Sequence, residues 1–247
     1  MKRVFTKALV AAGAIARCAG AAQAAPLNGT GDVTPDIIFG AGNGNGGFTG
    51  ETRNNIEVGL RGKQRFPAAD IFNYDGVQTY AFNSLVLTTN PANRSVFNLE
   101  WSVNVNQDGT GAGVLSDFDY VLSFDVDPSA SIAFVSIDPF ATFGYFDHAL
   151  GNNTTPNGGG IESTDNADLV ANMSAFSVAQ QTSNLGFGFS PDPDLLGTYD
   201  FKLEVFELGT TYLLASSAIT VRVTPVPLPA ALPLMLAGVG VFGFAAA

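Results

Sequence analysis

The stretch VFNLEWSVNV, residues 96–105, decides the fold because its apolar and polar residues alternate without a break from Phe97 to Val105. In an extended chain, one side of this stretch would carry polar residues and the other side the apolar set Phe97, Leu99, Trp101, Val103 and Val105. A period of two is typical of a β-strand with one buried face, whereas a helix repeats every 3.6 residues. The segment therefore predicts a half-buried β-strand.

The same alternation recurs along the chain, in NIEVGLR (55–61), FDYVLSFDV (118–126), YDFKLEV (199–205) and AITVRV (218–223). Turn-forming clusters rich in Gly and Asn separate these segments. We expect about eight or nine strands between Asp32 and Val223, and one short helix over residues 165–175. Because one-sided sheets must bury their apolar faces against each other, the pattern predicts an all-β fold. We expect an antiparallel β-sandwich, jelly-roll or immunoglobulin-like, with one polar, solvated face on each sheet.

The composition excludes several classes of protein. The net charge is −11, from 11 basic and 22 acidic residues, yet aromatic residues make up 11% of the chain. That aromatic content argues against an acidic disordered chain. The acidity argues against nucleic acid as a partner, since phosphate binding requires clustered Lys and Arg. The single cysteine, Cys18, precludes an internal disulfide.

The first residues are typical of a secretory signal peptide. A basic start with Lys2, Arg3 and Lys7 precedes an apolar stretch and then the small residues Ala22 and Ala24, which frame an A-x-A cleavage site. We therefore divide the chain into a signal peptide (1–24), a sandwich domain (25–224) and a C-terminal segment (225–247). Signal peptidase is the partner that this start implies.

Motifs for catalysis are weak. Gly42, Gly44 and Gly47 match the dinucleotide fingerprint G-x-G-x-x-G, but a strand-like segment follows them where that motif requires a helix. We interpret the run as a flexible loop. His148 is the only histidine, which leaves little scope for a catalytic triad or an imidazole metal site. We expect the protein not to be an enzyme, and we assign it no cofactor apart from the calcium considered next.

Acidic and basic side chains suggest two binding alternatives. In the segment around residues 118–126, four aspartates occupy the alternate positions that would face outward: Asp117, Asp119, Asp125 and Asp127. A pair of carboxylates on one strand face suits Ca²⁺. Asp192 and Asp194 form a second pair. The alternative function is therefore a calcium-assisted carbohydrate-binding module. Basic side chains also gather on one strand face: Arg61, Lys63 and Arg65. They would bind an anionic polysaccharide, form cross-strand ion pairs or simply make up a solvated face.

The chain closes with VPLPAALPLMLAGVGVFGFAAA, residues 226–247. Four prolines between Pro225 and Pro233 are incompatible with a central strand and favour an extended spacer. The 18 apolar or small residues from Ala230 to Ala247 would span about 27 Å as a helix, close to the thickness of the bilayer hydrocarbon. The segment predicts a short hydrophobic, membrane-spanning helix.

This ending resembles the C-terminal sorting signal of PEP-CTERM proteins in its VPLPA variant. The matching residues are Val226, Pro227, Leu228, Pro229 and Ala230, followed by the hydrophobic helix. Residues 226–247 do not include the terminal arginine cluster of such signals. The resemblance implies export by a Gram-negative bacterium that makes exopolysaccharide, and transient anchoring in the inner membrane. It further implies processing by an exosortase-like enzyme, and then a structural or adhesive role at the cell surface or in the extracellular matrix of a biofilm.

Overall fold

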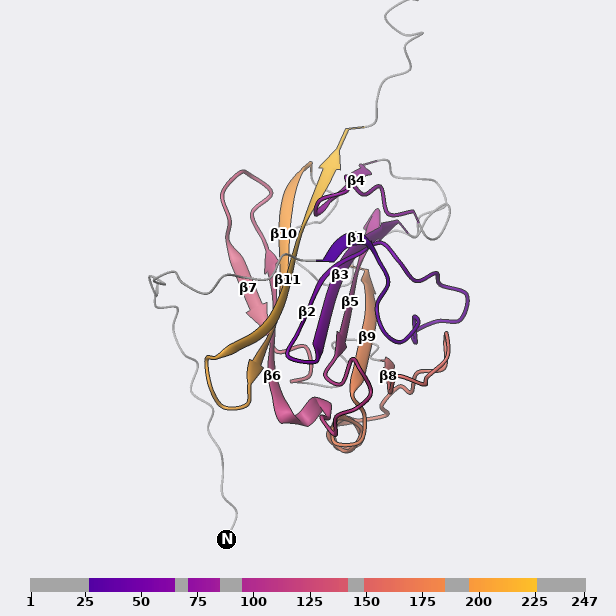
Figure 1. The fold of residues 1–247 in the computed structure, drawn as a ribbon. Coiled ribbons are helices and arrows are strands. Elements are labelled where there is room, and N and C mark those ends of the chain that lie inside the picture. Colours follow the sequence, from indigo (N-terminus) through magenta and orange to yellow (C-terminus); the bar gives the residue numbers. More distant parts are fainter. Residues whose placement is uncertain (1–26, 65–70, 85–94, 142–148, 185–195, 226–247) are drawn as a thin grey trace, which may run out of the picture.

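The computed structural model describes residues 27–64, 71–84, 95–141, 149–184 and 196–225, with the side chains described from Gly31 onward. Within these residues the chain forms two β-sheets packed face to face and one short helix, α1 (Asn166–Met173) (Figure 1). This β-sandwich confirms the predicted fold class in its coarse form. The predicted C-terminal helix, the signal peptide and the sorting motif lie outside the described residues.

The six-stranded sheet contains, in spatial order, β1 (Leu27–Gly31), β2 (Phe48–Arg53), β3 (Ile56–Gln64), β5 (Phe97–Asn104), β9 (Val178–Asn184) and β8 (Ala149–Gly151). The five-stranded sheet contains β4 (Thr79–Asn83), β11 (Leu213–Thr224), β10 (Gly197–Glu207), β6 (Phe118–Asp125) and β7 (Phe134–Ile137). All five sequence segments with strict alternation lie in strands, and the predicted helix is confirmed as α1.

Two details of the strand prediction differ in the structure. The described residues contain eleven strands, of which ten begin between Asp32 and Val223, where eight or nine were expected, because short strands such as β7 and β8 carry too few residues to show a period. The second difference concerns strand direction. β4 pairs with β11 in parallel, so the five-stranded sheet is not wholly antiparallel.

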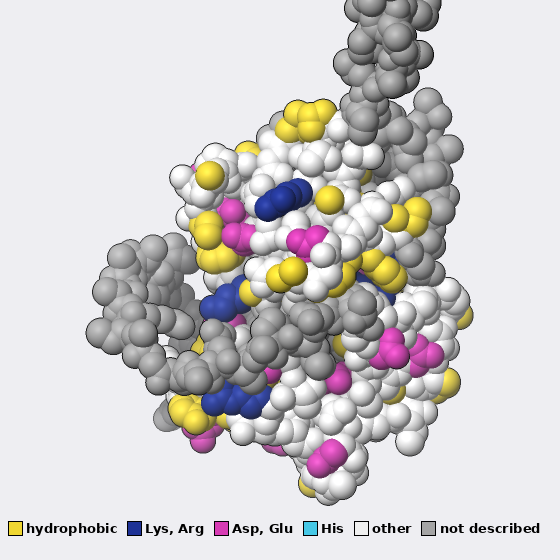
Figure 2. All heavy atoms as spheres, turned by 45° about the horizontal axis from the view of Figure 1, so that its top comes forward, with side chains coloured by type: hydrophobic (Ala, Val, Ile, Leu, Met, Phe, Trp, Pro, Cys, Tyr) yellow, Lys and Arg dark blue, Asp and Glu magenta, His cyan; other side chains and the backbone are white. Residues whose placement is uncertain are grey.

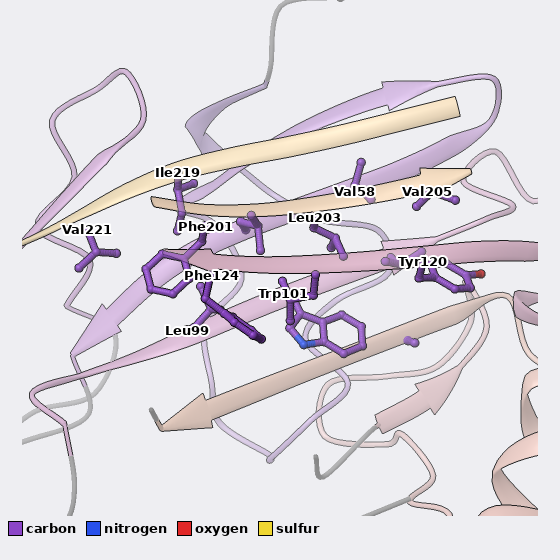
Figure 3. Packing of buried hydrophobic residues seen from close by; sticks show 14 of the residues in the cluster. Val58, Leu99, Trp101, Tyr120, Phe124, Phe201, Leu203, Val205, Ile219 and Val221 are labelled. Atoms are coloured by element: carbon purple, nitrogen blue, oxygen red, sulfur yellow. The ribbon is translucent and has the colours of Figure 1, made fainter. Parts of the chain in front are cut away.

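The core lies between the sheets and consists of the alternating apolar residues (Figure 3). Trp101 is fully buried at its centre, and its indole N–H donates to Gln181 Oε1 at 2.9 Å, so the ring leaves no unsatisfied donor. Phe97 of the six-stranded sheet meets Phe201 of the other sheet edge to face, with ring centroids 6.3 Å apart. Such burial of large apolar side chains is the main stabilising term of the fold.

The outer faces of the two sheets differ. The outer face of the five-stranded sheet is partly solvated, with Lys202, Thr220 and Arg222 reaching the surface, as expected. The outer face of the six-stranded sheet is covered, and here the expectation of a wet face is wrong. Its central strands, β3 and β5, bury a second row of polar side chains: Glu57, Arg61, Lys63, Asn98, Glu100, Ser102 and Asn104.

A segment that we call the strap, residues 33–47, contributes to this cover. Its residues join three from the sheet in a second, smaller apolar cluster: Val33, Ile37, Ile38, Phe39, Phe48, Ala149 and Val178. Gly40, Gly42, Gly46 and Gly47 have positive φ, which the strap uses to turn back toward β2. The predicted loop is therefore a layer of the structure that rests on the sheet.

Candidate functional site

Three charged side chains meet on the covered face of the six-stranded sheet. Arg61 and Glu100 are directly opposite each other on β3 and β5, and Arg61 Nε lies 2.6 Å from Glu100 Oε2. Lys63 Nζ lies 2.6 Å from the other oxygen of the same carboxylate, Oε1. The side chains of Arg61 and Glu100 are fully buried, and that of Lys63 is 4% exposed. We call these three residues the buried charge cluster.

Aromatic rings and the strap enclose the buried charge cluster. The guanidinium of Arg61 lies over two rings, 4.2 Å from the centroid of Phe48 and 4.6 Å from that of Phe72. Lys63 Nζ lies 5.7 Å from the ring centroid of Phe39. Arg61 Nη1 also donates to the carbonyl of Gly46 in the strap. Rings and backbone thus replace water around the charges, and ionic interactions are stronger in such surroundings.

Asn43 of the strap completes the site. Lys63 Nζ donates to Asn43 Oδ1 at 2.9 Å, while Asn43 Nδ2 donates to the carbonyl of Gly40 at 2.8 Å. The backbone around Asn43 is held as well, because Asn157 Nδ2 donates to the Asn43 carbonyl at 2.7 Å. The side-chain amide of Asn43 is therefore oriented with its oxygen toward Lys63.

A second carboxylate fastens the beginning of the strap. The N–H of Thr34 donates to Glu57 Oε1 at 2.6 Å, and the Thr34 carbonyl accepts from Asn104 Nδ2 at 2.8 Å. Burial raises the pKa of Glu57 to about 7, although the hydrogen bonds from Thr34 oppose this shift. Further along, Gln180 accepts from the N–H of Ile38 at 2.8 Å. The polar row of the sheet thus serves as a set of attachment points for the strap.

The predicted basic face has a different role from polysaccharide binding. Arg61 and Lys63 are buried and paired with Glu100, so they do not present charge to a polymer at the surface. The alternative of cross-strand ion pairs is confirmed for these two residues, and Arg65 lies outside the described residues. On the face shown in Figure 2, Lys, Arg, Asp and Glu side chains are scattered among small hydrophobic patches.

The structure separates the four candidate calcium ligands into two pairs. Asp117, in the 3₁₀ turn Leu115–Asp117, and Asp119 lie at one end of β6, and Asp125 and Asp127 lie at the other. The six residue steps from Asp119 to Asp125 span about 20 Å in a strand. No group of three or more His, Cys, Asp or Glu side chains within the described residues is arranged to hold a metal ion.

Each of these aspartates accepts a backbone hydrogen bond. Asp125 Oδ1 accepts from the N–H groups of Asp127 at 3.0 Å and Ala133 at 2.9 Å, which fixes the connection between β6 and β7. Asp127 in turn accepts from Ser129 at 2.9 Å, and these contacts with Ser129 lower the pKa of Asp127. The other two bind Val114 and Gly209, through Asp117 Oδ2 and Asp119 Oδ2 respectively. The observed role of all four is to hold turns.

The remaining sequence motifs are placed as follows. Gly42, Gly44 and Gly47 lie in the strap, and β2 follows them, which agrees with the interpretation of this run as a loop. His148, Asp192 and Asp194 lie outside the described residues, as do both predicted cleavage regions. Of the helices in the described part of the chain, none has the length and apolar character needed to cross a membrane.

Fold and site together define a two-sheet β protein whose polar outer face is closed by an N-terminal strap. Comparison of the chain with protein-family models, with curated proteins and with solved structures finds no match.

Sequence reasoning found Arg61 and Lys63 but missed Glu100, the third member of the buried charge cluster, and Asn43 beside it. For Glu100 the sequence did carry a signal, which is its charge opposite to that of Arg61 and Lys63. Glu100 has the outward parity of its predicted strand, and Arg61 and Lys63 have the outward parity of theirs. Opposite charges on the same face of two strands that pair are expected to meet. Nothing in the sequence marks Asn43 among the neighbouring asparagines of the strap.

Proposed function

We propose that this protein is an exported, non-enzymatic β-sandwich with a structural or adhesive role at the surface or in the exopolysaccharide matrix of a bacterium. Signal peptidase would cleave it after Ala24, and its C-terminal segment would anchor it in the inner membrane. An exosortase-like enzyme would then recognise Val226–Ala230 and release it for sorting. The jelly-roll or immunoglobulin-like arrangement and the C-terminal helix are part of this proposal.

The observation that carries the proposal is the closing sequence, VPLPA followed by an apolar run. The end of the described fold is compatible with it. β11, the last strand, ends at Thr224, immediately before Pro225, and both residues are exposed. Within the described residues, both sheets have their strands in place before the sorting segment begins. This arrangement would let a sorting enzyme act on the segment without unfolding the domain.

The test is localisation of the full chain and of a variant that lacks residues 226–247, expressed in an exosortase-containing Gram-negative host. We expect the full chain in the membrane and surface fractions and the truncated chain free in the medium. Intact mass spectrometry of the recovered protein reports both cleavage positions. Equal localisation of the two chains would show that the segment does not direct where the protein is localised.

A matched control separates the motif from simple hydrophobicity. Replacing Pro227 and Pro229 with alanine keeps the apolar run but changes the motif. We expect this variant to remain in the inner membrane unprocessed, as should the unaltered chain in a host without the exosortase. If the alanine variant is processed normally, the prolines are not what the enzyme recognises.

A further inference from the structure

Lys63 and Glu100 of the buried charge cluster form a reactive group of three with the neighbouring Asn43 of the strap. Lys63 Nζ lies 2.9 Å from the amide oxygen of Asn43 and 2.6 Å from Glu100 Oε1. These are an amine, a carboxamide and a carboxylate able to carry a proton between them. We propose that Lys63 and Asn43 become joined by an intramolecular isopeptide bond, with Glu100 as the proton carrier.

The reaction needs no oxidant, metal or second substrate. Glu100 accepts a proton from the Lys63 ammonium, and the neutral amine attacks Cγ of Asn43. The Nζ–Cγ bond forms as a tetrahedral intermediate, Glu100 returns the proton to Nδ2, and the Cγ–Nδ2 bond breaks. Ammonia leaves and takes up the remaining proton, so the balance is ammonium plus amide giving a new amide plus NH₄⁺. The chain becomes lighter by one NH₃, about 17 Da.

The geometry brings the reacting atoms close together. Cγ of Asn43 is bonded to the oxygen that already accepts from Lys63, so a small rotation of the amide brings the amine to the attacking distance of about 3–3.5 Å. The hydrogen bond from Asn43 Nδ2 to the Gly40 carbonyl, at 2.8 Å, restricts the amide to orientations near this one. Effective concentrations are high for groups that are held in this way.

The surroundings favour this reaction over the competing ones. Glu100 is fully buried and Lys63 nearly so, and the rings of Phe39, Phe48 and Phe72 line the cluster. Exclusion of water from Lys63 and Glu100 strengthens the electrostatic effect of nearby charges on the amine, while the Asn43 amide is partly buried at the edge of the cluster. Arg61 binds Glu100 Oε2 at 2.6 Å, which leaves Oε1 directed at Lys63. The amide of Asn43 is a better electrophile than the ion-paired carboxylate, so Asn43 is the acyl donor.

The bond would have a clear structural effect. It would connect the strap to β3 across a separation of 20 residues. A disulfide is the usual covalent cross-link in exported domains, but this chain has no cysteine after Cys18. An isopeptide bond would restrict the unfolded chain in the same way and, unlike a disulfide, would survive reduction. This inference is independent of the proposed sorting mechanism.

The test is mass spectrometry of the purified, folded protein. We expect the intact mass to be about 17 Da below that of the processed sequence. Trypsin should give one branched peptide, in which the fragment ending at Arg53 is joined through Asn43 to Gly62–Arg65, uncut at Lys63. Asn43→Ala and Lys63→Arg should restore the full mass, and Asn43→Asp should instead lose water, about 18 Da. Lys202→Arg, at the partly exposed ion pair with Glu204 on the other sheet, is the matched control and should keep the bond.

Four results would overturn the proposal. The first is an intact mass of the folded wild-type protein that equals the mass of the processed sequence, with no loss of ammonia. The second is a loss of about 17 Da that persists in Lys63→Arg, which would indicate a succinimide at Asn43-Gly44. The third is a branched peptide joined at Glu100 in place of Asn43. The fourth is retention of the bond in Glu100→Gln, whose fold is checked by circular dichroism, because this would exclude Glu100 as the proton carrier.

Discussion

Replacing Glu57 by glutamine should change how the stability of this protein depends on pH. Glu57 is 4% exposed and accepts a hydrogen bond from Thr34, and burial raises its pKa from 4.5 to about 7. The folded protein therefore binds more protons than the unfolded chain between these pH values. A raised carboxyl pKa means that the free energy of unfolding falls as the pH rises through this window, and is constant above it.

The magnitude follows from the size of the shift. Each pKa unit corresponds to about 1.4 kcal/mol, so the ionisation of Glu57 destabilises the fold by about 3 kcal/mol above pH 7. Glutamine keeps the oxygen that accepts from Thr34 but does not ionise. We expect Glu57→Gln to be similar to the wild type at pH 4.5 and about 3 kcal/mol more stable at pH 8.

The assay is urea unfolding of both proteins at several pH values, followed by the fluorescence of Trp101. This tryptophan is the only one in the chain, and it is fully buried. The difference between the two unfolding free energies removes the contribution of every other titrating group. Two parallel pH profiles separated by a constant offset would refute the reasoning, because they would show that Glu57 does not titrate differently in the folded state.

Three further predictions concern the charged residues. Glu100→Ala leaves Arg61 and Lys63 buried without their carboxylate and should destabilise the protein by about 3–5 kcal/mol. Lys202→Ala, which breaks the more exposed pair with Glu204, should change the free energy of urea unfolding by less than about 1 kcal/mol. Equal effects of the two variants would contradict the conclusion that the Glu100 cluster is the more deeply buried of the two. Addition of Ca²⁺ or EDTA should leave the melting temperature unchanged, since the carboxylates of Asp125 and Asp127 already accept backbone hydrogen bonds. A rise with Ca²⁺ that EDTA reverses would instead support the carbohydrate-binding alternative.

Local pattern was sufficient to predict the strands and the helix. In β5 and β6 the alternation identifies the residues that face the core, because a strand directs successive side chains to opposite sides. The helix α1 was predictable for a similar reason, since Leu169, Met173 and Phe176 lie at helical spacing and all three contact the core. The parallel pairing of β4 with β11 was not predictable, because five residues carry no information about a partner more than 100 residues away.

The sequence by itself determined that β3 and β5 each have one apolar and one polar face, and which residues lie on each face. It also placed the proline-rich segment after the last predicted strand. Only the tertiary structure decided that the polar face is buried. Alternation reports a difference between two faces, and a polar face bound by water produces the same pattern as one bound by a strap. The strap has no regular alternation of apolar and polar residues. It forms hydrogen bonds with Glu57, Lys63 and Gln180, which lie 20 or more residues away in the chain. Its docking therefore depends on hydrogen bonds that exist only once the strands of the six-stranded sheet have paired.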